Sequence, residues 1–195
     1  MSTDAVTLFF ALLAVVVQLA VVATLVALVA GGAGVRSRLV DTIGPDATKL
    51  ALAIATTATL GSLYLSEVAN FIPCRLCWIQ RGFMYPLVPL LALAEWRRIA
   101  LLQRLGLALA GVGACVSIYH VLLERMPQLE TDICAVENPC TLIWVNRFGY
   151  LTIPTMALSG FAGIITLLSL RWWYERRSGT FVTSERSEEP AHTAS

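Results

Sequence analysis

The chain has 195 residues, of which 57% are hydrophobic and only 14% charged, and its formal net charge is +1. Soluble domains are about 45–50% apolar and about 25% charged, so this composition argues against an ordinary soluble domain and indicates that lipid is the main solvent. Binding to nucleic acid needs a basic patch, and the near-neutral charge argues against that function.

Five apolar runs reach about 20 residues, the length of helix that crosses a bilayer. In chain order they cover residues 5–30, 50–71, 77–96, 100–123 and 151–173. Backbone hydrogen bonds close within a helix, so helices are stable in lipid. The sequence therefore predicts an all-α integral membrane protein that folds as a bundle of transmembrane helices.

The first run, residues 5–30, must be distinguished from a secretory signal peptide. It is longer than the apolar stretch of about 7–15 residues in such a peptide. No basic residue precedes it, and no clear Ala-x-Ala cleavage stretch ends it. We expect a retained transmembrane helix, followed by a cytoplasmic loop up to residue 49.

The third run is introduced by "PCRLCWIQRG", residues 73–82, which contains Cys74 and Cys77. Pro73 is suited to open a helix, so both sulfurs are expected in the first turn, where the macrodipole favours an anion. Cα atoms three positions apart on a helix are about 5 Å apart, within the range of a disulfide. This pair can therefore alternate between dithiol and disulfide.

Three further side chains share the helical face of this pair, namely Trp78, Arg81 and Tyr85. The cation of Arg81 is expected to lower a thiol pKa and to hold a thiolate, which makes the disulfide oxidising. Alternatively, Arg81 reaches to lipid headgroups, and the two aromatic residues belong to an interfacial belt.

A second pair, Cys134 and Cys140, lies in the loop before the fifth run, with a turn signal between them. A disulfide across so short a loop is sterically reasonable and could be a structural staple. Cys115 is alone in the fourth run and is expected to be a small buried hydrophobe. A zinc site of four thiolates would have an unusually wide second spacing and a cation beside it, so we expect no metal.

Basic residues are distributed unevenly between the two ends of the apolar runs. Four lie beside the cysteine pairs, and ten lie at the opposite ends: Arg36, Arg38, Lys49, Arg97, Arg98, Arg104, Arg171, Arg176, Arg177 and Arg186. The side richer in basic residues is cytoplasmic. The N-terminus and both cysteine pairs are thus expected outside, where disulfides persist. Residues 174–195 are expected to form a disordered cytoplasmic tail.

Three stretches carry a resemblance to a known family: "PCRLCWIQRGFMYPL" (73–87), "LGSLYLSEV" (60–68) and "YHVLLE" (119–124). They resemble the DsbB family of disulfide-bond formation proteins, especially its short-loop BdbC-like branch. The similarity covers roughly residues 50–173 and implies a DsbB-like four-helix redox domain. The helix within residues 1–49 is extra to that pattern, and its role is open.

The resemblance implies a membrane thiol-disulfide oxidoreductase of the bacterial plasma membrane. Such proteins re-oxidise an extracytoplasmic thiol oxidase of thioredoxin fold, of the DsbA or BdbD kind, and pass the electrons to a membrane quinone, either ubiquinone or menaquinone. By position, Cys134 would exchange with the partner and Cys140 would be its mate. Cys74 would exchange with the loop pair, and Cys77 would face the quinone.

The remaining site residues follow from this resemblance. Arg81 matches the arginine of the family's quinone site, where a guanidinium can donate a hydrogen bond to a quinone oxygen. Trp78 and Tyr85 are candidates to line the ring pocket. Quinone reduction consumes two protons, and His120 and Glu67 lie at the expected depth. The alternative for both is a polar residue satisfied at the membrane interface.

Two rival functions remain open at this point. A vitamin K epoxide reductase-type enzyme also combines a four-helix bundle with a quinone and two cysteine pairs. In that family the loop pair precedes the Cys-x-x-Cys pair, whereas here it follows. The other rival is a non-enzymatic membrane scaffold with two structural disulfides.

Overall fold

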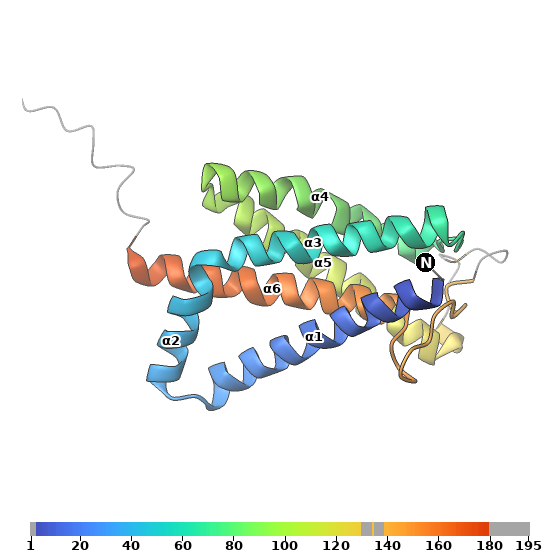
Figure 1. Ribbon diagram of the computed structural model, residues 1–195, viewed down its shortest axis with the longest axis horizontal. Coiled ribbons are helices and arrows are strands. Elements are labelled where there is room, and N and C mark those ends of the chain that lie inside the picture. The colour runs from blue at the N-terminus through green and yellow to red at the C-terminus, as the bar shows by residue number, and fades with distance from the viewer. Residues whose placement is uncertain (1–2, 130–133, 135–138, 180–195) are drawn as a thin grey trace, which may run out of the picture.

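The computed structural model of the chain describes residues 3–129, 134 and 139–179. Six α-helices account for most of these residues (Figure 1): α1 Thr3–Ala30, α2 Ala33–Ile43, α3 Ala47–Leu63, α4 Arg75–Arg97, α5 Ala100–Arg125 and α6 Ile153–Ser178. Three short helical turns join them, η1 Gly44–Asp46, η2 Tyr64–Val68 and η3 Pro127–Leu129. In the described part of the chain, the only strand-like pairing is an isolated bridge between Arg147 and Leu151.

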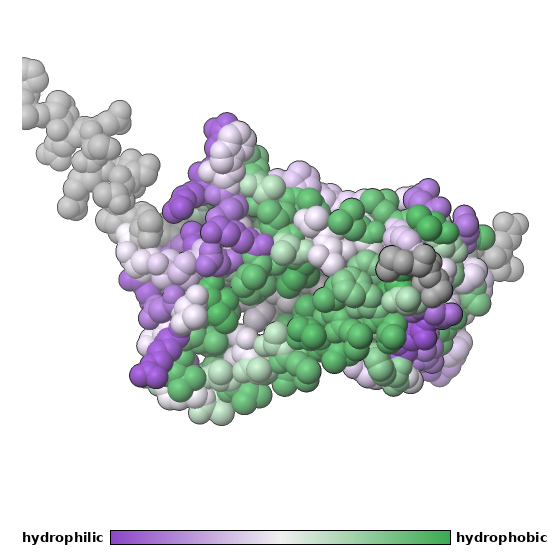
Figure 2. All heavy atoms as spheres, viewed as in Figure 1, coloured by the Kyte–Doolittle hydropathy of each residue, from purple (hydrophilic) through white to green (hydrophobic). Residues whose placement is uncertain are grey.

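The predicted all-α membrane fold is confirmed. Among the described residues, five helical segments are long and apolar enough to cross a bilayer: Thr3–Ala30, Ala33–Val68, Arg75–Arg97, Ala100–Arg125 and Ile153–Ser178. Figure 2 shows hydrophobic side chains gathered over the middle of the molecule and hydrophilic ones toward its two ends. This distribution is that of a protein whose middle lies in the hydrocarbon of a bilayer and whose two ends lie in water.

Helices α3, α4, α5 and α6 form a closed four-helix arrangement, in which each helix packs against two neighbours. Large apolar residues from α4 and α6, including Leu87, Leu91 and Phe161, are fully buried where these helices meet. Small residues such as Gly113 let the backbones approach, which is how helices associate in a solvent as apolar as their side chains. Cys115, expected to be buried, is exposed on α5, because its position faces away from this core.

Helix α1 is the extra helix, and it packs chiefly against α6 outside the four-helix arrangement. Near its N-terminus, Asp4 forms an ion pair of 2.6 Å with Arg147. Deeper in the helix, Gln18 donates a hydrogen bond of 2.8 Å to Ser159 on α6. Figure 1 shows α1 close to α6 in its first half and diverging toward α2.

Two expected boundaries are wrong. Residues 33–43, expected within a loop, form α2, which packs against α6 and α1. Helix α6 continues to Ser178, past residue 173, because Arg171 pairs with Glu175 one turn later at 2.7 Å. Arg171 also donates to the carbonyl oxygen of Pro45 at 3.1 Å. The rest of the expected tail, residues 180–195, lies outside the described residues.

Candidate redox site and adjoining cavity

Cys74 and Cys77 are free thiols at the start of α4, and their sulfur atoms lie 2.9 Å apart. Cys74 is not in the first turn, as the sequence suggests, but is the N-cap residue with an extended backbone, φ −70° and ψ 173°. Its sulfur accepts a hydrogen bond of 3.3 Å from the backbone N–H of Cys77. A cysteine thus occupies the position at which Ser or Asp usually caps a helix, and its sulfur faces the positive end of the macrodipole.

His120 lies on the other side of Cys74. Its Nε2 is 3.7 Å from the Cys74 sulfur and 3.1 Å from the carbonyl oxygen of Cys140. The ring is only 2% exposed, and its Nδ1 is buried without a hydrogen-bond partner among the described residues. The hydrogen bond with the Cys77 thiol, and after it the one with His120, lower the pKa of Cys74 to about 4, against the opposing effect of burial. Cys74 is therefore a thiolate at neutral pH.

The second cysteine pair packs on the first. Cys134 and Cys140 form a disulfide. Cys140 is buried in a cluster with Cys74 and two leucines, and both Cys77 and Cys134 lie against this cluster. The intervening residues 135–138 lie outside the described part of the chain. The structure therefore brings a thiolate and a disulfide into one apolar environment, the arrangement that thiol–disulfide exchange requires.

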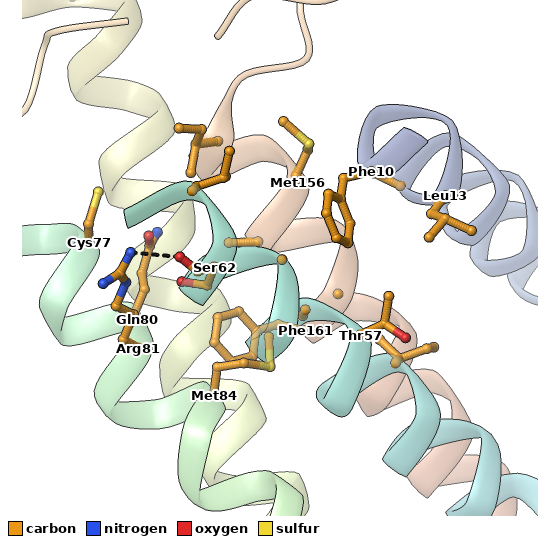
Figure 3. A pocket seen from close by; sticks show the side chains of 18 of the residues that line it. Phe10, Leu13, Thr57, Ser62, Cys77, Gln80, Arg81, Met84, Met156 and Phe161 are labelled. Atoms are coloured by element: carbon orange, nitrogen blue, oxygen red, sulfur yellow. Dashed lines mark hydrogen bonds between the residues drawn. The ribbon is translucent and has the colours of Figure 1, made fainter. Parts of the chain in front are cut away.

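A cavity of about 320 Å³ opens on the opposite side of Cys77, among α1, α3, α4 and α6. Its polar groups gather near the thiol, as Figure 3 shows for Ser62, Gln80 and Arg81. Arg81 donates a hydrogen bond of 3.0 Å to the carbonyl oxygen of Ser62, and the Tyr85 hydroxyl donates to the Ser62 hydroxyl at 3.3 Å. The remaining lining is almost entirely apolar, which is typical of a site for a mainly apolar ligand with one polar end.

The end of this cavity near Cys77 is shaped by an irregular stretch after α3. Residues Tyr64–Val68 form a π-helical turn, a feature frequent at functional sites. Phe71 follows it and stacks on Trp144 at a ring-centroid distance of 5.3 Å. Both aromatic rings line the cavity, and Trp144 also faces the smaller cavity around Cys74 and His120.

The site residues predicted from the sequence fall into two groups. Cys77, Arg81 and Tyr85 line the large cavity, because on a helix that begins after Cys74 they form one stripe at i, i+4 and i+8. Trp78 is 60% exposed and does not line it. The Trp78 ring instead packs against the Arg81 guanidinium, at 5.2 Å from centroid to carbon.

His120 and Glu67 also lie away from the large cavity. His120 faces the dithiol in the smaller cavity, together with Glu124. Glu67 is exposed on the π-helical turn, where its carboxylate accepts a hydrogen bond of 3.1 Å from Ser66. The structure therefore brings the four predicted cysteines and His120 together in one cluster. Arg81 and Tyr85 lie with Cys77 at the large cavity.

Sequence reasoning misses several residues of the site. Gln80 lines the cavity and donates to Ser117 at 3.0 Å, and its position as a polar residue within an apolar run is a usable signal. Glu124, beside the dithiol, accepts a hydrogen bond of 2.6 Å from Thr152. The contribution of Trp144 has no local signal, because it depends on how the outer loop folds back.

A metal is the other possible occupant of the thiol cluster. The ligand-type atoms of Cys74, Cys77 and His120 all lie within 4.8 Å of one another. Two sulfurs bound to tetrahedral zinc at about 2.3 Å would be about 3.7 Å apart, whereas these are 2.9 Å apart. The spacing suits a hydrogen bond between thiol and thiolate better than two ligands of one ion.

Comparison with known proteins identifies relatives of this chain. A family model described as disulfide bond formation protein DsbB matches residues 46–138. The probable disulfide formation protein C 1 of Bacillus anthracis is 44% identical over 108 residues, which cover 55% of this chain and 78% of the relative. Disulfide bond formation protein C of Bacillus subtilis strain 168 is 42% identical over 118 residues, which cover 60% of this chain and 86% of the relative. No solved structure gives a significant match.

Proposed function

The chain belongs to the DsbB family of disulfide bond formation proteins and is a multi-pass membrane protein, and from this premise we propose its place in electron transfer. We propose that it re-oxidises an extracytoplasmic thiol oxidase of thioredoxin fold and transfers the electrons to a membrane quinone. Family membership favours this role over the vitamin K epoxide reductase-type alternative.

One observation carries the proposal: the Cys74–Cys77 pair lies between a disulfide and a cavity. On one side Cys74 shares a buried cluster with Cys140. On the other side Cys77 lines the cavity that contains Arg81. An inner dithiol with a second cysteine pair on one side and a ligand cavity on the other is the layout of a relay, in which the second pair donates electrons once it has been reduced.

The relay balances in electrons and atoms. The partner's dithiol reduces the Cys134–Cys140 disulfide and itself becomes a disulfide, through a mixed disulfide. The resulting loop dithiol reduces a Cys74–Cys77 disulfide in the same way. When the Cys74 thiolate and the Cys77 thiol close again to a disulfide, they release two electrons and one proton, because the proton of Cys74 has already been lost on ionisation. The observed combination, an inner dithiol beside a loop disulfide, is the state just before that release.

The cavity fits a quinone by the chemistry of its lining. A bound quinone supplies a lipid-soluble acceptor of two electrons and two protons. Arg81 and Tyr85 are the groups that would hold its polar ring beside Cys77, since both are hydrogen-bond donors at that end of the cavity. The Arg81 cation also stabilises negative charge next to the sulfur. Ubiquinone and menaquinone both meet these requirements.

His120 serves the dithiol in this proposal. Its Nε2 can hydrogen-bond the Cys74 thiolate across the observed 3.7 Å, and its imidazole can accept a proton that the thiols release. Glu124 lies in the same small cavity and offers a second proton acceptor. Cys77 lines both cavities, so protons held at His120 and Glu124 are next to the place where a quinone would be reduced.

The test uses the purified full-length protein with a reduced thiol oxidase of thioredoxin fold and a quinone, and follows quinol formation by absorbance. Cys77→Ser and Cys134→Ser should each abolish turnover, because each interrupts the relay. Cys115→Ser is the matched control and should keep full activity, because Cys115 is exposed on α5 away from the site. Full activity in either relay variant would overturn the proposal and favour a scaffold with structural disulfides.

A further inference from the structure

Helix α1 contributes a continuous apolar stripe to the large cavity. Phe10, Leu13, Ala14 and Val17 all line it, at the i, i+3, i+4 and i+7 spacing of one helical face. Figure 3 shows Phe10 and Leu13 extending from α1 toward the space between α3 and α6. The neighbouring Leu12 points elsewhere and is 50% exposed.

The position of this stripe is fixed by polar contacts along α1. Gln18 donates to Ser159 at 2.8 Å and accepts from the Tyr150 hydroxyl at 3.0 Å. At the N-terminal end, Arg147 donates to Asp4 at 2.6 Å and to the Thr7 hydroxyl at 2.9 Å. A slip of one residue would break all of these bonds, so they set which face of α1 meets the cavity.

Two glycines receive the stripe on the bundle. A Cβ atom at Gly61 of α3 would lie 2.8 Å from the ring of Phe10. One at Gly163 of α6 would lie 2.8 Å from a methyl group of Val17. Both distances are too short for a side chain larger than hydrogen at Gly61 or Gly163. The side chains of Phe10 and Val17 can therefore pack directly against the backbones of α3 and α6 at these two glycines. Close helix approach at glycine is a regular feature of membrane packing.

The two ends of the cavity therefore differ in chemistry. At one end Cys77 lies with the donors Arg81 and Tyr85, and at the other the stripe of α1 faces apolar residues of α3 such as Ile54. A ligand with a polar ring and a long apolar chain fits this division in one orientation only. Its ring belongs beside Cys77, and its chain belongs between α1 and α3.

We infer that α1 is part of the quinone site, and that Phe10, Leu13 and Val17 line the passage for the isoprenoid tail. This inference rests on the proposed function, since it takes the quinone as ligand. The family match covers residues 46–138 and does not include α1. The extra helix thus gives this chain a wall of the site that the matched part of the chain does not supply, and a means to select among quinone tails.

The first experiment is photo-cross-linking of the wild-type, full-length protein. A quinone that carries a diazirine on its isoprenoid tail is bound and irradiated, and labelled peptides are identified by mass spectrometry. The expected label lies in the peptide that contains Phe10–Val17, and excess unlabelled quinone removes it. Saturable label that is confined to α4, α5 or α6 overturns the role of α1 and leaves the proposed function standing. Absence of saturable label anywhere overturns both.

The second experiment compares two tryptophan variants on adjacent positions of α1. Binding is measured in a Cys74→Ser background, in which Cys77 cannot close to a disulfide with Cys74, by protection of Cys77 from alkylation, with a long-tailed quinone and with a ring analogue that has no tail. Leu13→Trp fills the passage and should weaken binding of the long-tailed quinone by about tenfold, with little effect on the tail-less analogue. Leu12→Trp, at the exposed position, should change neither. Equal effects of the two variants, or equal losses for both ligands in Leu13→Trp, would contradict the inference.

Discussion

Cys74 caps a helix, and in the proposed function it also carries redox chemistry, two roles that are usually separate. As the N-cap residue, its sulfur accepts a hydrogen bond from the backbone N–H of Cys77. A negatively charged sulfur accepts a stronger hydrogen bond than a neutral one. The same hydrogen bonds and the nearby His120 that favour the thiolate also stabilise the reduced pair. A dithiol stabilised in this way has an oxidising disulfide, so in the proposed relay the cap favours the transfer of electrons to the inner pair.

The first prediction concerns the pH dependence of Cys74 alkylation in the reduced pair. The thiolate is the reactive form, and the pKa of Cys74 is about 4. Its rate should therefore be nearly constant from about pH 6 to pH 8 and fall about tenfold per unit well below pH 4. The alkylation rate of an ordinary thiol would instead fall steeply as the pH is lowered from about 8 to about 6. The measurement is iodoacetamide labelling of a Cys115→Ser variant, with peptide mapping to separate the two thiols.

The matched variant for this prediction is Cys77→Ala, which removes the largest cause of the lowered pKa. The pKa of Cys74 should rise, so its labelling at about pH 6 should slow while labelling at about pH 9 is maintained. A wild-type profile that climbs steadily up to pH 8 would show that Cys74 is a normal thiol, and the cap argument would be lost.

The Cys-x-x-Cys motif predicts those site residues whose positions follow from spacing along one helix. Cys77, Arg81 and Tyr85 lie on one helical stripe and line one cavity. Trp78 is three positions from Arg81 and so lies next to that stripe, and the sequence does not show which edge of the stripe faces the cavity, because this depends on how α4 is rotated against its neighbours. His120, predicted to lie at the depth of a quinone ring, faces the dithiol and not the large cavity, since helix rotation depends on packing between α5 and its neighbours.

At the scale of the helix, small residues decide how closely elements approach. Gly113 of α5 faces the ring of Phe161 on α6, and a Cβ atom there would overlap the ring. Phe161 is fully buried in the core, and its ring could relieve such an overlap only by leaving its packed position, toward the cavity that it lines. Gly111 lies on the same helix, and a Cβ atom there would meet nothing within 4 Å. The two glycines form a matched pair for a packing test.

The second prediction is that Gly113→Ala destabilises the bundle and Gly111→Ala does not. Overpacking typically costs about 1–3 kcal/mol, whereas replacing an unconstrained helical glycine by alanine is neutral or favourable by up to about 1 kcal/mol. Thermal unfolding of both variants in the same detergent measures the difference. Phe161→Leu should restore part of the loss in Gly113→Ala. Equal stability of the two alanine variants would mean that α5 and α6 are not packed as closely as described.

The long helices were predictable because apolar length alone identifies them, but α2 was not. It has 11 residues and begins after Gly32 without a side-chain cap, so the usual start signal is missing. Its position comes from contact with α6, where Tyr174 packs against Gly44 at its end. The placement of α1 is equally non-local, because its ion pair joins residues 143 positions apart. Tertiary contacts of this kind leave no periodic pattern in the sequence.

At the scale of the whole molecule, the relay needs both cysteine pairs on the side where the thiol oxidase partner is found. The two ends of the described bundle differ in charge, with nine basic residues at the end remote from the cysteines and four beside them. If the end richer in basic residues is the cytoplasmic one, as the proposed function requires, Cys74 and Cys134 lie outside. The cavity then opens at the outer end of the bundle, beside Phe71 and Trp144.

The last prediction tests this orientation with single cysteines in a variant whose five native cysteines are replaced by serine. Gln128→Cys lies in η3 beyond the outer end of α5, and Thr42→Cys lies in α2 at the opposite end; both positions are exposed. A membrane-impermeant maleimide should label Gln128→Cys in intact cells and label Thr42→Cys only after permeabilisation. The reverse pattern would place the dithiol in the reducing cytoplasm, where disulfides do not persist. The dithiol would then be separated from the proposed extracytoplasmic thiol oxidase by the membrane. The same measurement therefore tests both the topology and the proposed direction of electron flow.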